Sequence, residues 1–324
     1  MAAEDLALTW QLTPKNLFFS KGDKQDLRLG DFAQAFSLSE ELSSDPTSSV
    51  VILGYPDDEG IRLNGGRPGA ALAPDRIRYF LYKMTPSVLS EKSIHWLDMG
   101  NLKSELPLIE RHRQAEKAVF SLCQKNLFFF SLGGGHDYGF PDAAGFVESE
   151  LKQGQRPVVI NFDAHLDVRP FQDQPHSGTP FYRLLEKYNS RFDFVEVGLQ
   201  NHCNSRSHYE WAKNQGAHFL FLDQIKPTHL FSQIENLIPL KNRRLFVSLD
   251  MDCLRSSEAP GCSASYPTGL SATHLMECLV QIKKQTHLKG LGVYEVSPPL
   301  DVADHTSQLT ALILHRMSYS ESLA

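Results

Sequence analysis

The sequence predicts an α/β fold in which helices cover both faces of a parallel sheet. Short apolar runs of strand length alternate along the chain with longer segments of helical periodicity. Runs such as 158–160 are apolar at every position, which is typical of strands buried on both faces of a parallel sheet. With 324 residues, of which 41% are hydrophobic and 22% charged, the chain can enclose a large core.

The first 48 residues differ from the rest because they are mixed in composition and end in the Ser-rich segment 42–49. We predict an N-terminal arm and linker over residues 1–48, with a short helix near Asp31 to Ala35. Since neither an internal repeat nor a convincing break follows, residues 49–324 are predicted to form one α/β domain.

Strands and helices are then predicted in regular alternation. Apolar runs predict strands at 50–54, 94–97, 126–132, 158–162, 194–199, 218–222, 244–250 and 288–296. Helical patterns cover 74–81, 107–125, 142–152, 180–188, 206–215, 230–238, 270–284 and 305–317. Pro74 and Pro180 lie in the first turns of two helices, where the missing N–H costs no hydrogen bond. The Gly-rich segment 57–70 predicts a loop.

Charge and cysteine content exclude several classes of protein. The formal net charge is −6 and no basic block occurs, which argues against nucleic-acid binding. No apolar run approaches the length of a membrane span. The five cysteines are scattered, and no pair has the spacing of a zinc finger. Reduced thiols in a cytoplasmic protein are therefore expected.

Three side chains that can bind a metal follow the buried run 158–162. Asp163, His165 and Asp167 alternate, so an extended chain would turn all three toward one side. Two carboxylates beside an imidazole repel and desolvate one another unless a cation lies among them. The alternative is an ordinary polar strand end exposed to solvent.

Other predicted strands end in side chains of the same kind. His136 follows three glycines, Asp250 and Asp252 end the run from 244, and Glu295 lies near the end of the last strand. Ligands of an open parallel sheet bind beyond the carboxyl ends of its strands. A nitrogen and oxygen ligand set without thiolate suits Mn²⁺, and two such ions can lower the pKa of a shared water to about 7. Taken alone, a histidine after glycines is also compatible with a structural role.

These motifs resemble those of a known family. Gly133–Asp137, Asp163–Asp167 and Ser248–Asp252 look like the three metal motifs of the ureohydrolases, which include arginase, agmatinase and formimidoylglutamase. The resemblance covers about residues 50–318 and implies an α/β/α sandwich on a parallel sheet of about eight strands, usually in a homo-oligomer.

The resemblance also implies the metal ligands. One of two Mn²⁺ ions per subunit would be held by His136, Asp163, Asp167 and Asp250, and the other by His165, Asp163, Asp250 and Asp252. Asp167 would also hydrogen-bond the water that the ions share. Glu295 would hold the cationic guanidine or amidine of the substrate.

Three loops favour one branch of this family. The segments 259–264, 62–70 and 177–181 resemble loops of formimidoylglutamases, and the Asp-Pro that commonly follows the last metal motif is absent after Asp252. The implied reaction is hydrolysis of N-formimidoyl-L-glutamate to L-glutamate and formamide, a step of histidine degradation. The alternative is another ureohydrolase specificity, namely agmatinase, guanidinobutyrase or arginase.

Arg169 is the first candidate for substrate recognition. It lies two residues after Asp167, where a fixed guanidinium can hold a substrate carboxylate in bidentate fashion. Alternatively it points to solvent or pairs with Asp173. Further candidates in the Gly-rich segment are Arg62, Asn64 and Arg67, although this segment also fits an ordinary connection between strand and helix.

His176 and Ser177 occupy the loop in which arginases place a proton-shuttling histidine. The resemblance puts Ser177 at that position and His176 one residue earlier. Two roles stay open for His176, either proton delivery to the leaving amine or a place at the rim of the site.

Two other classes of protein compete with this prediction. A single-zinc deacylase of similar fold would leave His136 and Asp252 without a ligand role. A catalytically silent scaffold would be expected to lose ligands, whereas this sequence keeps all six.

Overall fold

The computed structural model describes residues 9–40 and 45–320. Ten strands form one sheet in the order β1-β4-β3-β5-β10-β9-β6-β7-β8, and β2 pairs with β4 beside this path. The strands are β1 (Trp10–Gln11), β2 (Ala33–Ala35), β3 (Ser49–Gly54), β4 (His95–Leu102), β5 (Phe128–Leu132), β6 (Val158–Phe162), β7 (Asp193–Leu199), β8 (His218–Phe221), β9 (Arg244–Asp250) and β10 (His287–Tyr294). Only β1 runs antiparallel to its neighbour among the described strands, so β3 to β10 form the parallel eight-stranded unit that the motifs implied.

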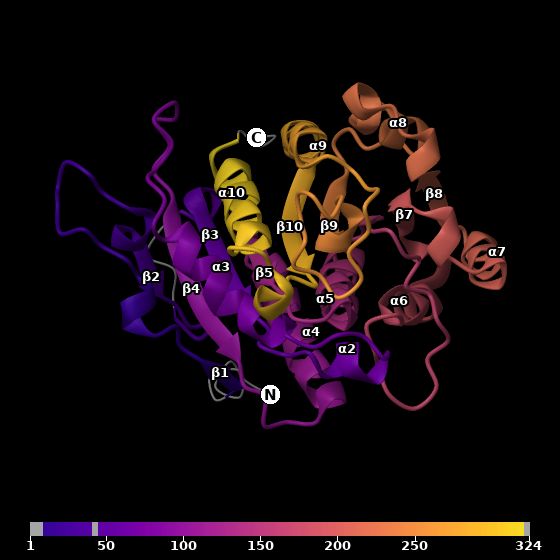
Figure 1. Ribbon diagram of the computed structural model, residues 1–324. Helices are drawn as coiled ribbons and strands as arrows, with labels where there is room; N and C mark the ends of the chain where they lie inside the picture. The colour runs from indigo at the N-terminus through magenta and orange to yellow at the C-terminus, as the bar shows by residue number, and fades with distance from the viewer. Residues whose placement is uncertain (1–8, 41–44, 321–324) are drawn as a thin grey trace.

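Helices cover both faces of this sheet and give the α/β/α sandwich (Figure 1). The helices are α2 (Glu59–Leu63), α3 (Ala73–Leu81), α4 (Leu108–Gln124), α5 (Gly139–Lys152), α6 (Pro180–Tyr188), α7 (Arg206–Asn214), α8 (Leu230–Leu237), α9 (Ala272–Gln285) and α10 (His305–Tyr319). One core cluster joins the sheet to α3, α8, α9 and α10, and a second joins its other face to α4, α5 and α6. No described helix has the length and apolar content needed to cross a membrane.

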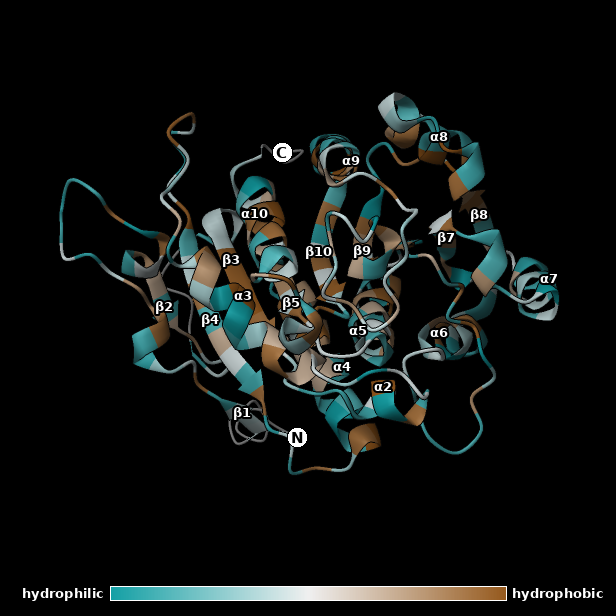
Figure 2. Cartoon of the chain, viewed as in Figure 1, coloured by the Kyte–Doolittle hydropathy of each residue, from teal (hydrophilic) through white to brown (hydrophobic). Residues whose placement is uncertain are grey.

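The apolar runs are explained by burial on both faces. In β3, Val50 and Ile52 pack into the first core cluster, whereas Val51 and Leu53 pack into the second. Figure 2 shows brown, hydrophobic segments along the central strands and teal, hydrophilic segments on much of the outer helices. Two buried faces require apolar residues at consecutive positions, which is why these strands lack polar alternation.

The N-terminal segment and the Gly-rich loop differ from the prediction. The prediction of a short helix near Asp31 to Ala35 is wrong, because Ala33–Ala35 is a strand that pairs with β4 in parallel. Trp10–Gln11 also pairs with β4, so parts of the predicted arm extend the sheet. Within 57–70, residues Glu59–Leu63 form the short helix α2.

Candidate metal centre

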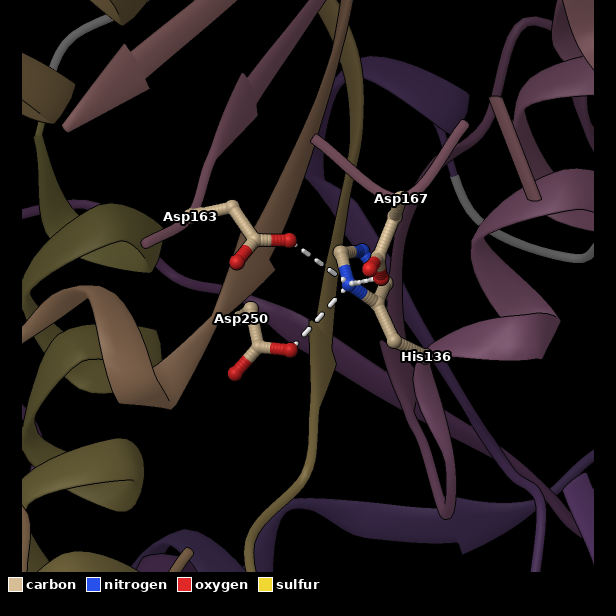
Figure 3. A group of neighbouring side chains, drawn as sticks. All are labelled: His136, Asp163, Asp167 and Asp250. Carbon is tan, nitrogen blue, oxygen red and sulfur yellow. Dashed lines mark ion pairs between the residues drawn. The ribbon is translucent and has the colours of Figure 1, made fainter. Parts of the chain in front are cut away.

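His136 and three aspartates form the centre of the site, with Asp163 and Asp167 from the segment after β6 and Asp250 from the end of β9. The imidazole Nδ1 lies 3.0 Å from Asp163 Oδ2, 3.0 Å from Asp167 Oδ2 and 3.1 Å from Asp250 Oδ2. Figure 3 shows these contacts converging on one ring nitrogen. The ligand atoms of the four residues lie within 4.8 Å of one another, as a shared cation requires.

The chain after β5 brings His136 into this position. At Gly134, an added Cβ would lie 1.6 Å from the carbonyl oxygen of Asp57, so only glycine allows the two backbones to approach so closely. His136 then opens a short 3-10 helix, and its backbone N–H donates to Glu295 Oε1 at 3.0 Å. The three glycines thus serve close packing of the loop that presents the histidine.

The environment of His136 favours a positive charge at its Nδ1 side. Burial alone would lower the pKa of His136, but contacts with Asp163, Asp167 and Asp250 outweigh it, and the pKa is raised well above its usual value. The other ring nitrogen, Nε2, lies 2.9 Å from Ser248 Oγ. Since Ser248 fixes the ring orientation, Nδ1 is the nitrogen available to a metal ion.

A second cluster shares Asp163 with the first. His165 Nδ1 lies 3.1 Å from Asp252 Oδ2 and 3.4 Å from Asp163 Oδ1, and these three residues form a separate group of possible ligands. The His165 Nε2 atom lies 3.2 Å from the hydroxyl of Tyr266. Two cation positions that share one carboxylate are typical of binuclear sites.

The segment after β6 reaches the site through a turn. β6 ends at Phe162, and Asp167 has a left-handed backbone with a φ of 47°. The prediction that Asp163, His165 and Asp167 continue an extended strand is therefore wrong, although all three reach the two clusters. Alternation along the strand cannot account for this convergence, because the chain leaves the strand before Asp163.

Glu295 also has a left-handed backbone, with a φ of 64°. Its backbone N–H donates to the carbonyl of Gly134 at 2.9 Å, which holds the residue in this conformation. Burial, the largest effect, raises the pKa of the Glu295 carboxyl to about 8, and the negative charge of Asp252 acts in the same direction. A cationic group that binds beside such a buried carboxyl stabilises its ionised, negatively charged form.

A cavity of about 540 Å³ opens onto both clusters. Four of the predicted substrate residues line it, namely Asn64, Arg67, Arg169 and Ser177. Arg169 Nη1 donates to Asn64 Oδ1 at 2.6 Å, and Asn64 Nδ2 donates to Ser177 Oγ at 2.9 Å. No ion pair joins Arg169 to Asp173 within residues 9–40 and 45–320.

The other predicted site residues have different surroundings. Arg67 donates from Nε to the Ser263 carbonyl and from Nη2 to the Cys262 carbonyl, both at 3.0 Å, so it anchors the 259–264 loop. Arg62 is exposed and paired with Asp58, outside the cavity lining. His176 is also absent from this lining, and its Nδ1 accepts a hydrogen bond from the Gly178 N–H at 3.2 Å.

The arginase family model matches residues 48–319. This chain belongs to the arginase family. It is 32% identical over 271 residues to a formimidoylglutamase of Streptococcus gordonii, covering 81% of this chain and 82% of the relative. A formimidoylglutamase of Lysinibacillus sphaericus is 29% identical over 318 residues, with 95% of each chain covered.

Solved structures agree with this family assignment. The crystal structure of Trypanosoma cruzi formiminoglutamase with Mn²⁺ superimposes with a TM-score of 0.79 at 28% identity, covering 91% of this chain and 98% of that one. The proclavaminate amidino hydrolase of Streptomyces clavuligerus, at 24% identity and a TM-score of 0.71, shares the fold.

The residues of this arginase-family protein fit a pair of Mn²⁺ ions. The buried His136 Nδ1 has no hydrogen-bond partner that satisfies normal geometry, yet three carboxylate oxygens surround it. Imidazole and carboxylate are ligands that Mn²⁺ accepts, and no thiolate joins either described cluster. Asp250 Oδ1 accepts the Asp252 N–H at 2.8 Å, and Asp250 belongs to the first cluster only, so its place on the second ion stays a prediction.

The sequence interpretation missed three supporting residues. Ser248 and Tyr266 contact the outer nitrogens of the two histidines. Beneath them, Asn161 Nδ2 lies 3.3 Å from Asp163 Oδ2 and 2.9 Å from Glu196 Oε2. Polar residues in apolar strands were the available signal for Ser248 and Asn161, since buried polar groups need partners. No sequence pattern pointed to Tyr266.

Proposed function

We propose that this protein is a binuclear manganese hydrolase that cleaves N-formimidoyl-L-glutamate to L-glutamate and formamide in histidine degradation. One observation carries the proposal: a single cavity joins the two acidic clusters and Glu295 to the guanidinium of Arg169. The substrate has the complementary charges, since its amidinium is cationic and its glutamate part carries two carboxylates. The relatives named formimidoylglutamases support the same substrate.

The chain's own residues orient the substrate from two sides. The Glu295 carboxylate binds the amidinium and turns its carbon toward the clusters, because the side chain is buried at the wall of the cavity. Arg169 is held by Asn64 and presents its guanidinium to a carboxylate of the substrate. Binding at both ends fixes the amidine carbon, which lowers the entropic barrier to attack.

Asp167 is the group proposed to move the proton. It lines the cavity beside Asp250 and Asp252. One of its oxygens can accept the proton that water loses on attack and pass it to the departing nitrogen of glutamate. The water oxygen bonds to the amidine carbon, the bond from that carbon to the glutamate nitrogen breaks, and formamide leaves.

The two Mn²⁺ ions would be held by His136, Asp163, Asp167 and Asp250 and by His165, Asp163, Asp252 and Asp250. Their chemical contribution, when bound, is to lower the pKa of water toward neutrality, to about 7. Ser248 and Tyr266 keep the two imidazoles oriented for this task.

Agmatinase, guanidinobutyrase or arginase activity is the alternative within the family. Agmatine carries no carboxylate and a second positive charge, so Arg169 would repel it. The cavity wall beside Arg169 therefore favours a substrate with carboxylates.

The decisive experiment compares substrates on the manganese-loaded protein. Formimidoylglutamate, agmatine, guanidinobutyrate and arginine are each supplied, and glutamate, putrescine, aminobutyrate and ornithine are measured with the bound Mn²⁺. We expect glutamate release from formimidoylglutamate at a much higher kcat/KM than any other reaction, with two Mn²⁺ per chain. A preference for agmatine or arginine would overturn the substrate assignment.

The Asp163→Ala variant tests the centre itself. Because both clusters share Asp163, we expect loss of Mn²⁺ binding and of turnover. Asp173→Ala is the matched control, since Asp173 is exposed and outside the cavity lining. An active Asp163→Ala enzyme would refute the binuclear scheme.

We also propose a cytoplasmic location and a homo-oligomeric assembly. All five cysteines are free thiols, which suits a reducing compartment. Sedimentation of the purified chain measures the assembly, and cell fractionation measures the location.

A further inference from the structure

A second pocket lies at the amino ends of the parallel strands, whereas the metal centre lies at their carboxyl ends. Its volume is about 250 Å³, and it is lined by the first residues of β3, β5 and β10. The metal centre lies beyond the carboxyl ends of β5, β6 and β9, so the parallel sheet separates the two sites.

The lining of this pocket is basic. Lys92, Lys283, Lys289 and His287 surround it. Among the described residues that line it, none is an aspartate or glutamate. This is a marked concentration of positive charge in a chain whose formal net charge is −6.

Lys283 is the most deeply placed of these cations, with 5% of the residue exposed. Its ammonium donates to the carbonyl of Met317 and lies 4.7 Å from the ring centroid of Phe128. No ion pair joins it to a carboxylate in the described part of the chain. Burial and the nearby charge of Lys92 lower the pKa of Lys283 to about 7, since no carboxylate pairs with the ammonium in the described part of the chain.

Lys289 lines the same pocket, and nearby negative charge balances its positive charge only in part. Its Nζ donates to Asn126 Oδ1 at 2.5 Å. Burial and Arg244 lower its pKa, and the negative charge of Glu150 opposes them. Glu150, however, already accepts a hydrogen bond from Arg244 at 3.0 Å, so its charge is shared between two cations.

We propose that this pocket is a binding site for a small oxyanion, of which the phosphate group is the chemical class, held by Lys92, Lys283 and Lys289. Ammonium groups bind phosphate as point charges that approach from several directions, which matches three lysines on different elements. A bound dianion would balance the buried charge of Lys283 and stabilise its protonated form. The site is independent of the proposed catalytic function, because it shares no lining residue with the catalytic cavity.

The test is calorimetric titration of the manganese-loaded protein, after removal of free Mn²⁺, at constant ionic strength set with chloride. Inorganic phosphate is the first probe, and glycerol 3-phosphate distinguishes a phosphate ester from the free ion. The variants are Lys283→Met and Lys92→Met. Lys117→Met, on the exposed side of α4 and outside the pocket, is the matched control.

We expect saturable binding of at least one probe to the wild type and to Lys117→Met. The loss of a charge-assisted contact should weaken probe binding about tenfold in Lys283→Met. In Lys92→Met the loss should be about threefold, because the Lys92 side chain is exposed. If Lys283→Met does not fold, Lys92→Met and a double Lys92→Met, Lys289→Met variant decide the question. The proposal is overturned if neither probe binds the wild type, or if the folded pocket variants bind as tightly as Lys117→Met.

Discussion

Replacing Lys283 by methionine should change how the stability of the protein depends on pH. The Lys283 ammonium is buried, and its pKa in the folded state is about 7 instead of the ordinary 10.5. Below the folded pKa, both the folded and the unfolded chain hold the proton, and the folded state bears the full cost of a buried charge. Between the two pKa values only the unfolded chain holds it, so stability rises with pH across this window.

The magnitude follows from the separation of the two pKa values. Each unit of separation corresponds to about 1.4 kcal/mol. Between about pH 6.5 and pH 8.5, the contribution of Lys283 to the free energy of unfolding should therefore become more favourable by about 2 kcal/mol. Methionine does not titrate, so the stability advantage of Lys283→Met over the wild type should narrow by this amount over the same range.

The assay is urea unfolding of both proteins, manganese-loaded, in chloride buffers without phosphate. Comparing the two proteins at each pH cancels the titration of groups that do not interact with Lys283. At pH 6.5 we expect the methionine variant to be the more stable relative to wild type, and its advantage to shrink as the pH rises. A stability difference that stays constant from pH 6.5 to 8.5 would refute the burial argument.

Three further predictions concern the catalytic cavity. Tyr266→Phe should weaken the binding of one Mn²⁺ about tenfold in a competition titration, because the Nε2 atom of His165 loses its hydrogen-bond partner. Unchanged affinity for both ions would show that Tyr266 does not orient His165. Arg169→Met should raise KM for formimidoylglutamate about tenfold or more, with the melting temperature preserved. Arg169→Lys should recover part of this loss of affinity. An unchanged KM in both variants would show that Arg169 does not bind the substrate. His176→Asn should keep most of kcat, since an amide oxygen can accept the Gly178 N–H in place of Nδ1; loss of activity with a shifted pH profile would instead support proton delivery by His176.

The strands of the central sheet were predictable, whereas the pieces at its edge were not. β3 and β6 are apolar at nearly every position because both faces are buried, and that pattern is visible in the sequence. Ala33–Ala35 is partly or fully exposed at every position and three residues long, so it has no burial periodicity. Its pairing with β4 depends on tertiary contacts that local sequence does not encode.

The candidate site shows the same division. Side-chain type and position at strand ends, together with the resemblance to the ureohydrolases, predicted six candidate ligands, and all six lie in the two clusters because a parallel sheet brings the carboxyl ends of its strands together. Their binding of Mn²⁺ stays a prediction. The turns that complete the site could not be predicted from the sequence, and the left-handed backbone of Asp167 is one example. Tyr266 approaches His165 from a loop about one hundred positions away, and no spacing rule connects the two.

Two residues of the site, Asp167 and Glu295, combine a left-handed backbone with a carboxylate that the proposed chemistry uses. A left-handed conformation costs a residue other than glycine about 1–2 kcal/mol, and Asp167 and Glu295 both adopt it within the site. Each is held by backbone hydrogen bonds, since the Asp167 carbonyl accepts the Phe181 N–H at 3.1 Å and the Glu295 N–H donates to Gly134. Glycine at either position would relieve the conformation but remove the carboxylate, so the chain retains strain where the proposed chemistry needs a carboxylate. Phe181 belongs to α6 and Gly134 lies in the glycine turn before His136, so these two segments hold the two residues through main-chain hydrogen bonds.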